Sequence, residues 1–539
     1  MGKISLLDCT LRDGGYVNQW NFGNGTIICI YDRLTEAGID IIEIGFLDER
    51  EPFDMERSIQ PNTNAMNICY HGTVPKKAMI LAMIDIGTCS IDNIQPKEDT
   101  ILDGIRVIFK KERMYEAIDF AEQLTMKGYQ VFLQLVSITD YKEEDIKKLA
   151  DYCKKIHPYA VSIVDTYGLM HQEQVHDYFG WLDKYLEPSI GIGYHSHNNF
   201  QLAYSNTIEL LNMKTDRNMI LDGTLYGMGK SAGNAPLELL AMYLNENCGK
   251  NYDLSQILEA ISSEILPIHE KYYWGYSQFF FISAQNGCHP NYVKFLMDKK
   301  TLSIKDVNII LGRIESNRKL RYSEEYIDTL YGEYVLENID DSNCIECLRK
   351  EFSRETILIL GPGKTVMDQT ETIRKFIKSE DPIVMSTNFV PEEIKVDFLF
   401  ISNPLRYSLI IPKIANKDIK VIGTSNVTPV GRSFDYTLRY DLLLAKNTIW
   451  DNSLAILLNF FKKVGVKKIA LAGFDGFVKD PQKNYFDTGF DLSKSYEYLS
   501  SVNRCMTKMI SDTRADMNVV FVTPSIYEGY NNSEDVIDQ

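Results

Sequence analysis

The sequence predicts an α/β protein: a (β/α)8 TIM barrel with a helical extension, followed by a Rossmann-like α/β domain. Apolar, β-branched runs alternate with amphipathic stretches early in the chain, a helical pattern follows, and a second alternating region begins near Thr356. A chain of 539 residues is too long for one hydrophobic core, so several domains are expected. We predict a barrel over 1–250, a helical subdomain over 251–350 and the Rossmann-like domain over 351–539.

The barrel prediction depends on eight strand-like runs with helical patterns between them, such as 27–37, 114–127 and 144–156. The eight runs are 4–9, 39–44, 78–84, 104–109, 130–136, 160–164, 190–194 and 219–221. Eight strands with eight crossovers in ~230 residues is the pattern of a (β/α)8 barrel.

The rest of the chain changes pattern twice. Helical spacing dominates from about 253 to 340, with helices expected near 292–297, 304–314 and 324–337. Strand-like runs then return, which predicts an open and mostly parallel sheet. These runs are 356–360, 382–385, 398–401, 421–423, 468–472 and 519–522, and a helical stretch to 377 follows the first.

Polar residues follow several predicted barrel strands, where such barrels keep their chemistry. Asp13 follows the first strand, and His195 and His197 follow the seventh at positions i and i+2, on one face of an extended segment. One Asp and two His suffice for an octahedral divalent metal with open positions. Arg12 would sit beside this metal and hold an oxyanion. The alternative is a structural aspartate with two surface histidines, but the joint spacing favours a metal site.

Four motifs in this order resemble the Asp-Arg-Glu barrel metallolyase superfamily, which includes hydroxymethylglutaryl-CoA lyase, isopropylmalate and homocitrate synthases and 4-hydroxy-2-oxovalerate aldolase. The resemblance covers about residues 1 to 340. The motifs are Asp8-Cys9-Thr10-Leu11-Arg12-Asp13-Gly14, Glu43-Ile44-Gly45, His195-Ser196-His197 and Gly227-Met228-Gly229-Lys230-Ser231-Ala232-Gly233-Asn234.

The resemblance implies roles for these residues. Asp13, His195 and His197 would hold Mn²⁺ or Mg²⁺, which a 2-oxo acid would chelate through its keto and carboxylate oxygens. Arg12 would donate a hydrogen bond to the enolate oxygen. Glu43 would fix Arg12 by a paired contact; the alternative is a buried polar residue inside the barrel.

Two further residues are assigned to substrate binding. Asp165 follows the sixth predicted strand. Asn234 is a candidate substrate contact and a candidate further metal ligand, as in the lyase and synthase branches, or else a turn residue after Gly233.

The chain order and the helical tail look closest to the 4-hydroxy-2-oxo acid aldolases. Tyr276 lies in a segment similar to the one that carries their active-site tyrosine, so it is a candidate acid/base residue; the alternative is a packed core tyrosine. Those aldolases carry a histidine three residues after the metal aspartate, whereas this chain has Tyr16 there. A phenol has an ordinary pKa of about 10 and is a poor base at pH 7 without tuning. Either Tyr16 acts as the base with metal assistance, or His289 or a water molecule replaces the aldolase histidine, or the substrate differs.

The sequence therefore predicts a metal-dependent aldolase or lyase that cleaves or forms a 4-hydroxy-2-oxo acid through a pyruvate enolate. The expected partners are a small-molecule 2-oxo acid and an aldehyde. One alternative is an acyl-CoA-dependent condensing enzyme of the isopropylmalate or homocitrate synthase type. Another is a bifunctional protein whose C-terminal domain binds a nucleotide or nucleotide-sugar in surface-polysaccharide synthesis.

The C-terminal domain carries glycine-rich turns without a complete nucleotide motif. Gly361-Pro362-Gly363-Lys364-Thr365 lacks the spacing of a Walker loop, which needs four residues between its glycines. Glycines between a strand and a helix still suit a phosphate on the helix N-terminus. With Leu471-Ala472-Gly473-Phe474-Asp475-Gly476, the region is weakly similar to nucleotide-binding domains of bacterial sialyltransferase and pterin-diphosphokinase-like groups. The alternative is a sheet whose glycines only make tight turns.

Composition excludes several classes of function. The net charge of −17 argues against nucleic acid or an anionic membrane as the main partner. No apolar run reaches the ~18 residues that span a bilayer. Ten cysteines without a regular framework suit a reducing cytoplasm, and the strand-like start of the chain leaves no room for a signal peptide. A homo-oligomer is kept as one candidate assembly state.

Overall fold

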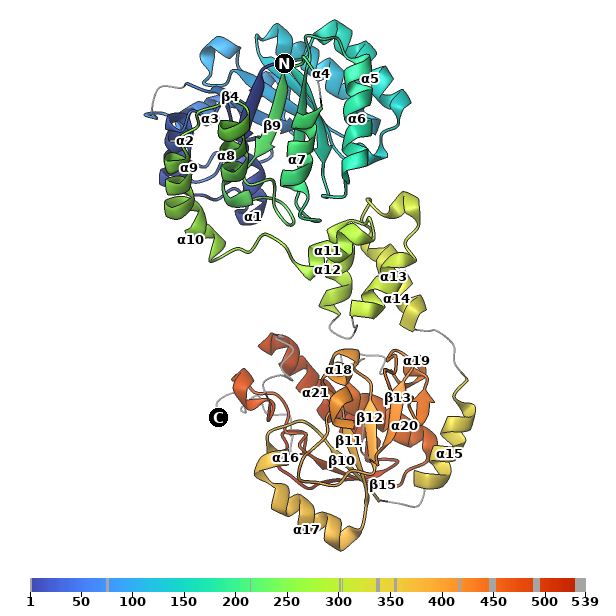
Figure 1. Ribbon diagram of the computed structural model, residues 1–539. Helices are drawn as coiled ribbons and strands as arrows, with labels where there is room; N and C mark the ends of the chain where they lie inside the picture. Colours follow the sequence, from blue (N-terminus) through green and yellow to red (C-terminus); the bar gives the residue numbers. More distant parts are fainter. Residues whose placement is uncertain are drawn as a thin grey trace. The chain divides into compact units, whose positions relative to one another are not determined.

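The computed structural model describes residues 2–73, 77–213, 215–299, 302, 304–335, 340–352, 356–414, 418–444, 452–487 and 495–528. The chain forms two compact units, Met1–Pro290 and Asn291–Gln539 (Figure 1). The predicted barrel lies in the first unit. The helical extension continues across the division between the units, so a separate subdomain over 251–350 stays a prediction.

The first unit is built on a closed barrel of eight parallel strands, which confirms the predicted fold. Neighbouring strands pair in the order β1-β9-β8-β7-β6-β5-β4-β2, and β2 pairs back to β1. The strands are β1 (Ile4–Asp8), β2 (Ile41–Leu47), β4 (Met79–Asp85), β5 (Gly104–Phe109), β6 (Gln130–Leu135), β7 (Ala160–Asp165), β8 (Gly191–Ser196) and β9 (Met219–Gly223). The short β3 (Ile59–Gln60) pairs with β2 outside this ring and was not predicted.

Helices cover the outside of the strands, as Figure 1 shows for α4 to α8. Their apolar residues recur at helical spacing and pack against the outward face of the barrel, as Ile146, Leu149 and Cys153 do on α5. The helices are α1 (Gly15–Asn18), α2 (Asn24–Glu36), α3 (Thr63–Cys69), α4 (Met114–Met126), α5 (Glu143–Ile156), α6 (Gln172–Tyr185), α7 (Ala203–Asn212) and α8 (Leu237–Asn247).

Further helices follow the barrel, in agreement with the predicted helical pattern. The helix predicted over 324–337 is observed as α14, and positions 336 and 337 lie outside the described residues. The helices are α9 (Leu254–Ala260), α10 (Leu266–His269), α11 (Gln278–Gln285), α12 (Pro290–Asp298), α13 (Ile304–Gly312), α14 (Glu324–Val335) and α15 (Ser342–Phe352).

The second unit contains a seven-stranded parallel sheet with the order β14-β13-β12-β11-β10-β15-β16, which confirms the predicted α/β class. The strands are β10 (Thr356–Leu360), β11 (Ile383–Thr387), β12 (Phe398–Ile401), β13 (Lys420–Thr424), β14 (Tyr436–Leu438), β15 (Lys468–Ala472) and β16 (Asn518–Phe521). The helices are α16 (Thr365–Asp368), α17 (Thr370–Glu380), α18 (Pro404–Ile414), α19 (Tyr440–Leu443), α20 (Ser453–Val464) and α21 (Tyr496–Thr513).

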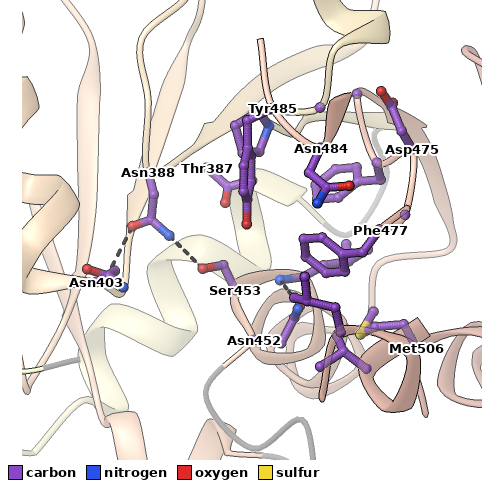
Figure 2. A pocket seen from close by; sticks show the side chains of 18 of the residues that line it. Thr387, Asn388, Asn403, Asn452, Ser453, Asp475, Phe477, Asn484, Tyr485 and Met506 are labelled. Carbon is purple, nitrogen blue, oxygen red and sulfur yellow. Dashed lines mark hydrogen bonds between the residues drawn. The ribbon is translucent and has the colours of Figure 1, made fainter. Parts of the chain in front are cut away.

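A pocket of about 160 Å³ lies at the carboxyl edge of this second sheet. Figure 2 shows amide, hydroxyl and aromatic side chains around it, among them Asn388, Ser453 and Tyr485. Within the described ranges, no helix is long and apolar enough to cross a membrane.

Candidate active site

Arg12 and Asp13 are presented by an unusual turn directly after β1. Thr10–Gly14 forms a single wide helical turn, with the Asp13 N–H donating to the Cys9 carbonyl at 2.8 Å. The buried Asp8 carboxylate fixes the start of this turn, because it accepts hydrogen bonds from the Thr10 N–H at 2.9 Å and the Thr10 hydroxyl at 2.7 Å. The turn thereby places a cation and a carboxylate side by side at the carboxyl end of the strand.

The two histidines present the same ring nitrogen to Asp13. His195 lies on β8 with its Nδ1 3.0 Å from an Asp222 oxygen, and His197 has its Nδ1 3.1 Å from the Asp165 carbonyl oxygen. Since a carbonyl oxygen only accepts, the His197 Nδ1 carries the proton. The Nε2 atoms then lie 3.9 Å and 3.4 Å from the Asp13 oxygens. Metal-binding imidazoles are held in this way, with the second nitrogen on a carboxylate or carbonyl.

The donor set of this site fits a divalent metal. One ligand atom from each of Asp13, His195 and His197 lies within 4.8 Å of the others. His197 Nε2 and Asn234 Oδ1 are buried and have no hydrogen-bond partner among the described residues. A set of nitrogen and oxygen ligands in which two atoms have no hydrogen-bond partner suits a divalent metal ion with octahedral coordination. Asn234 is tied to the same place, because its Nδ2 donates to Asp13 Oδ2 at 2.6 Å.

Burial and charge act in opposite directions on the ionisation of these groups. Burial favours the neutral acid, but Arg12 and the two imidazoles hold the pKa of the Asp13 carboxyl well below its usual range. Burial lowers the pKa of His195, and the Asp222 contact offsets this only in part. Asp13 is therefore an anion and His195 a neutral imidazole at pH 7, as metal ligands must be.

Buried ion pairs extend from this site into the barrel interior. Arg12 contacts Asp13 at 2.6 Å and Glu43 at 2.7 Å, as the sequence predicts for the pairing of Arg12 with Glu43. Arg106, from β5, contacts Glu43 at 3.1 Å and Asp222 at 2.5 Å. Each of these side chains is at most 4% exposed, so water screens their charges little.

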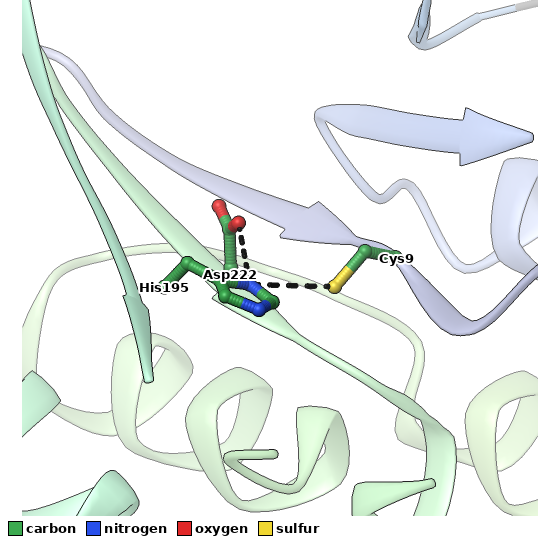
Figure 3. A group of neighbouring side chains, drawn as sticks. All are labelled: Cys9, His195 and Asp222. Atoms are coloured by element: carbon green, nitrogen blue, oxygen red, sulfur yellow. Dashed lines mark hydrogen bonds and ion pairs between the residues drawn. The ribbon is translucent and has the colours of Figure 1, made fainter. Parts of the chain in front are cut away.

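Cys9, His195 and Asp222 form a neighbouring group (Figure 3) whose ligand atoms also lie within 4.8 Å of one another. The Cys9 Sγ is 3.9 Å from His195 Nδ1 and donates to the Gly223 carbonyl at 3.4 Å. Burial raises the pKa of the Cys9 thiol well above its ordinary value. Asp222 Oδ2 accepts from Arg106 as well as contacting His195, so we assign this group to the orientation of His195.

Gly229 belongs to the site because it leaves room for two of its members. A Cβ at position 229 would lie 2.2 Å from Asn234 Nδ2 and 2.6 Å from Asp13 Oδ2. Only glycine lets the backbone come this close to the carboxylate.

Asp165 contributes through its backbone and through its loop. Its carboxylate accepts the N–H groups of Leu169 at 2.9 Å and Met170 at 3.1 Å, and its carbonyl oxygen holds His197. Substrate binding by the Asp165 carboxylate stays a prediction, since both of its oxygens already serve this loop.

Tyr16 and His289 are connected to the site through Lys230, which contacts the Tyr16 ring and Asp13 and whose charge acts on His289. The Lys230 Nζ lies 5.4 Å from the centre of the Tyr16 ring, and its backbone N–H donates to Asp13 Oδ2 at 3.3 Å. Desolvation of the hydroxyl raises the pKa of Tyr16 to about 12. Desolvation, together with the charges of Lys230 and Lys110, lowers the pKa of His289 to about 4.

Tyr276 is 55% exposed, and its carbonyl accepts a hydrogen bond from the Tyr273 hydroxyl at 2.6 Å. Among the described residues, no hydrogen bond connects the Tyr276 hydroxyl to Arg12 or Asp13. Its catalytic role stays a prediction.

Arg106 and Asp222 are site residues that none of the sequence motifs indicated. Each is a charged residue inside an otherwise apolar strand, in Gly104-Ile105-Arg106-Val107 and Ile220-Leu221-Asp222-Gly223. Charged side chains are almost never fully buried without a partner, so this pattern was a usable signal.

Residues 3–263 match the model of the HMGL-like family. The chain is 27% identical over 264 residues to oxaloacetate decarboxylase from Mycobacterium tuberculosis, covering 48% of this chain and 76% of that protein. It is 29% identical over 269 residues to 4-hydroxy-2-oxovalerate aldolase from Pelotomaculum thermopropionicum, covering 48% of this chain and 75% of that protein. Among solved structures, HMG-CoA lyase from Bacillus subtilis matches with a TM-score of 0.40 at 17% identity, covering 50% of this chain and 94% of that one.

Proposed function

We propose that the barrel, whose residues 3–263 match the model of the HMGL-like family, is a divalent-metal-dependent carbon–carbon lyase. Its substrate is a 4-hydroxy-2-oxo acid, which it cleaves to or forms from an aldehyde and pyruvate through the pyruvate enolate. The observation that carries the proposal is the convergence of two imidazole Nε2 atoms on Asp13, with Arg12 paired to the same carboxylate.

Asp13, His195 and His197 are the proposed metal ligands, with Asn234 Oδ1 as a further candidate. Mn²⁺ or Mg²⁺ would supply Lewis-acid polarisation of the 2-oxo group. The buried lone pairs of His197 Nε2 and Asn234 Oδ1, which no described residue satisfies, support this assignment.

Arg12 is the proposed donor to the enolate oxygen. Its Nε is committed to Glu43 and its Nη1 to Asp13, so the guanidinium is held in one orientation. Nη2 makes no hydrogen bond to a described residue and is the donor left for substrate. A fixed donor of this kind stabilises developing negative charge without reorganisation during the reaction.

The proton transfer needs a base. Tyr16 is disfavoured unless the metal assists it, because desolvation raises the pKa of its phenol to about 12, well above pH 7. His289, with a pKa of about 4, is neutral at pH 7 and can accept a proton, though weakly. A water molecule is the third candidate, and Tyr276 stays a candidate proton donor on resemblance alone.

A second candidate reaction is the decarboxylation of oxaloacetate, which the similarity to the mycobacterial oxaloacetate decarboxylase favours. Loss of carbon dioxide from oxaloacetate leaves the same pyruvate enolate. The two reactions therefore need the same stabilisation from Arg12 and differ in the group that leaves.

The test is release of pyruvate by the full-length protein with Mn²⁺, followed with lactate dehydrogenase and NADH. The proposal predicts pyruvate from a 4-hydroxy-2-oxo acid, and none after chelation. Pyruvate from oxaloacetate alone would assign the decarboxylase reaction. Thiol release from acetyl-CoA and a 2-oxo acid, without pyruvate formation, would assign the condensing reaction instead.

A further inference from the structure

The pocket in the second unit lies where the strand order of the sheet reverses. From β10 the chain adds strands in the direction of β14, whereas β15 and β16 add on the other side. The pocket is lined by residues that end or follow β10, β11, β12 and β15, including Gly363, Thr387, Asn403 and Phe474. Ligands of open parallel sheets bind in the crevice at this reversal point.

Three asparagines in the pocket present hydrogen-bond donors (Figure 2). The Oδ1 atoms of Asn403 and Asn452 accept N–H groups in the first turns of α18 and α20, at 3.1 Å and 3.0 Å. Asn484 Oδ1 accepts the N–H of Val478 at 2.7 Å. Because an N–H only donates, each oxygen is fixed on the backbone. The three Nδ2 groups make no hydrogen bond to a described residue and remain for a ligand.

The acceptors of the pocket are mostly committed to the protein. Asp475 is the single carboxylate among the described residues that line it. Its oxygens accept the Thr365 N–H at 2.8 Å and the Thr365 hydroxyl. The Asp475 carboxylate therefore takes the position at the start of α16 where the sequence predicts a phosphate. The pocket is rich in donors, so it suits a ligand rich in acceptors.

Aromatic rings and one guanidinium complete the walls. Phe477 and Tyr485 have ring centres 6.0 Å apart in an edge-to-face arrangement. The Arg406 guanidinium lies 5.1 Å from the centre of the Tyr485 ring. A cavity of this volume is on the scale that holds one six-membered ring. Arginine beside an aromatic ring suits a flat ligand that carries an anionic group.

We propose that this pocket binds a nucleotide, independently of the barrel reaction. The base lies against Phe477 and Tyr485 and its carbonyl and ring-nitrogen acceptors face the asparagine amides, with the phosphate on Arg406. A free sugar fits less well, because it has no flat ring to lie against Phe477 and Tyr485, and the Asp475 carboxylate that could accept its hydroxyl protons is held by Thr365.

Isothermal titration of the full-length protein tests this with UMP, CMP, AMP and GMP, and with inorganic phosphate and methyl glucoside as separate probes. We expect saturable binding of nucleotides, tighter for the single-ring bases, and at least tenfold weaker binding of phosphate or the glucoside. Absence of nucleotide binding at millimolar concentration would overturn the proposal. Equal affinity for phosphate alone, or binding of the glucoside alone, would do so as well.

Asn403→Asp and Asn452→Asp test the donor role. Aspartate caps a helix as well as asparagine does, so the fold is retained, whereas the Nδ2 donor becomes a negatively charged acceptor. We expect at least about tenfold weaker nucleotide binding for each variant. Asn62→Asp, at the start of α3, is the matched control and leaves binding unchanged. Wild-type affinity in both pocket variants would show that these asparagines do not bind the nucleotide and would overturn the proposal. The two variants alter different helices, so either one alone suffices if the other fails to fold.

Discussion

Glu43 joins two buried arginines through one oxygen, since its Oε2 accepts from Arg12 Nε at 2.7 Å and from Arg106 Nη1 at 3.1 Å. Arg106 continues to Asp222, which contacts His195. Residues from β2, β5, β8 and β9 thus connect Arg12 to a metal-ligand candidate through alternating charges inside the barrel. The orientation of Arg12 and of His195 is therefore set by the same network.

Removal of Arg106 from this network leaves the buried Asp222 carboxylate without a cationic partner and Glu43 with Arg12 alone. Arg106→Met should lower the free energy of unfolding of the barrel by about 3–5 kcal/mol, the cost of breaking a buried ion pair. Urea unfolding measures this. The control is Arg113→Met, whose pair with Glu116 is about half exposed; its loss should cost less than about 1 kcal/mol. Equal effects of the two substitutions would contradict the importance of the network.

The metal-ligand assignment is tested by alanine substitution of the histidines. His195→Ala and His197→Ala should each lose bound Mn²⁺ and activity while circular dichroism stays unchanged, because each removes one of three ligands. Metal content per chain is the measurement. His176→Ala, at an exposed ring paired with Glu209, is the control and keeps the metal. Full occupancy in either site variant would exclude that histidine.

Arg12→Lys preserves the charge but loses the planar fork that serves Glu43 and Asp13 together with the substrate. We expect kcat to fall by at least ~100-fold, the scale for loss of one oxyanion donor, with metal content retained. Steady-state kinetics and metal analysis on the same preparation check both parts. Arg50→Lys, with a 68% exposed side chain, should change neither. A near-normal kcat for Arg12→Lys would remove Arg12 from the chemistry.

Gly229→Ala tests the close approach of the backbone to the metal site. The added Cβ meets Asn234 and Asp13, so metal affinity should fall by at least about tenfold, the lower end of the range for disturbed supporting contacts. Gly180→Ala is the control, since a Cβ there has no atom within 4 Å. Metal titration distinguishes the two, and equal affinities would show that the site adapts to the added carbon.

The identity of the base is tested by exchange of deuterium into the methyl group of pyruvate, a half-reaction that needs no aldehyde. Since Tyr16 is a poor base at pH 7, Tyr16→Phe should leave exchange nearly unchanged, and His289→Ala should slow it if His289 is the base. Slow exchange in Tyr16→Phe, with recovery in Tyr16→His, would instead assign the role to position 16. Absence of exchange in the native protein with bound metal would mean that pyruvate is not the nucleophile.

Local sequence sufficed for most of the barrel. Strand β5 occupies the predicted residues 104–109, because a buried strand is recognisable as an apolar run, here interrupted only by Arg106, with a polar turn on either side. The three residues of β14 were missed, since Tyr436-Thr437-Leu438 is too short to establish an alternating pattern. Its pairing with β13 is decided by the sheet rather than by the segment itself.

In the candidate site, too, some features follow from the local sequence and others only from the tertiary structure. The motifs around Asp13 and His195 identified the candidate ligands, because their residue types and strand-end positions are properties of short segments. The contacts that fix the tautomer of His197, pair Arg106 with both Glu43 and Asp222, and hold Thr365 on Asp475 join residues between 32 and 116 positions apart. Such contacts depend on which strands become neighbours when the sheets form. The sequence by itself therefore determined the strands and the ligand candidates, and only the tertiary structure decided their partners, since hydrogen bonds and ion pairs form between groups that are close in space.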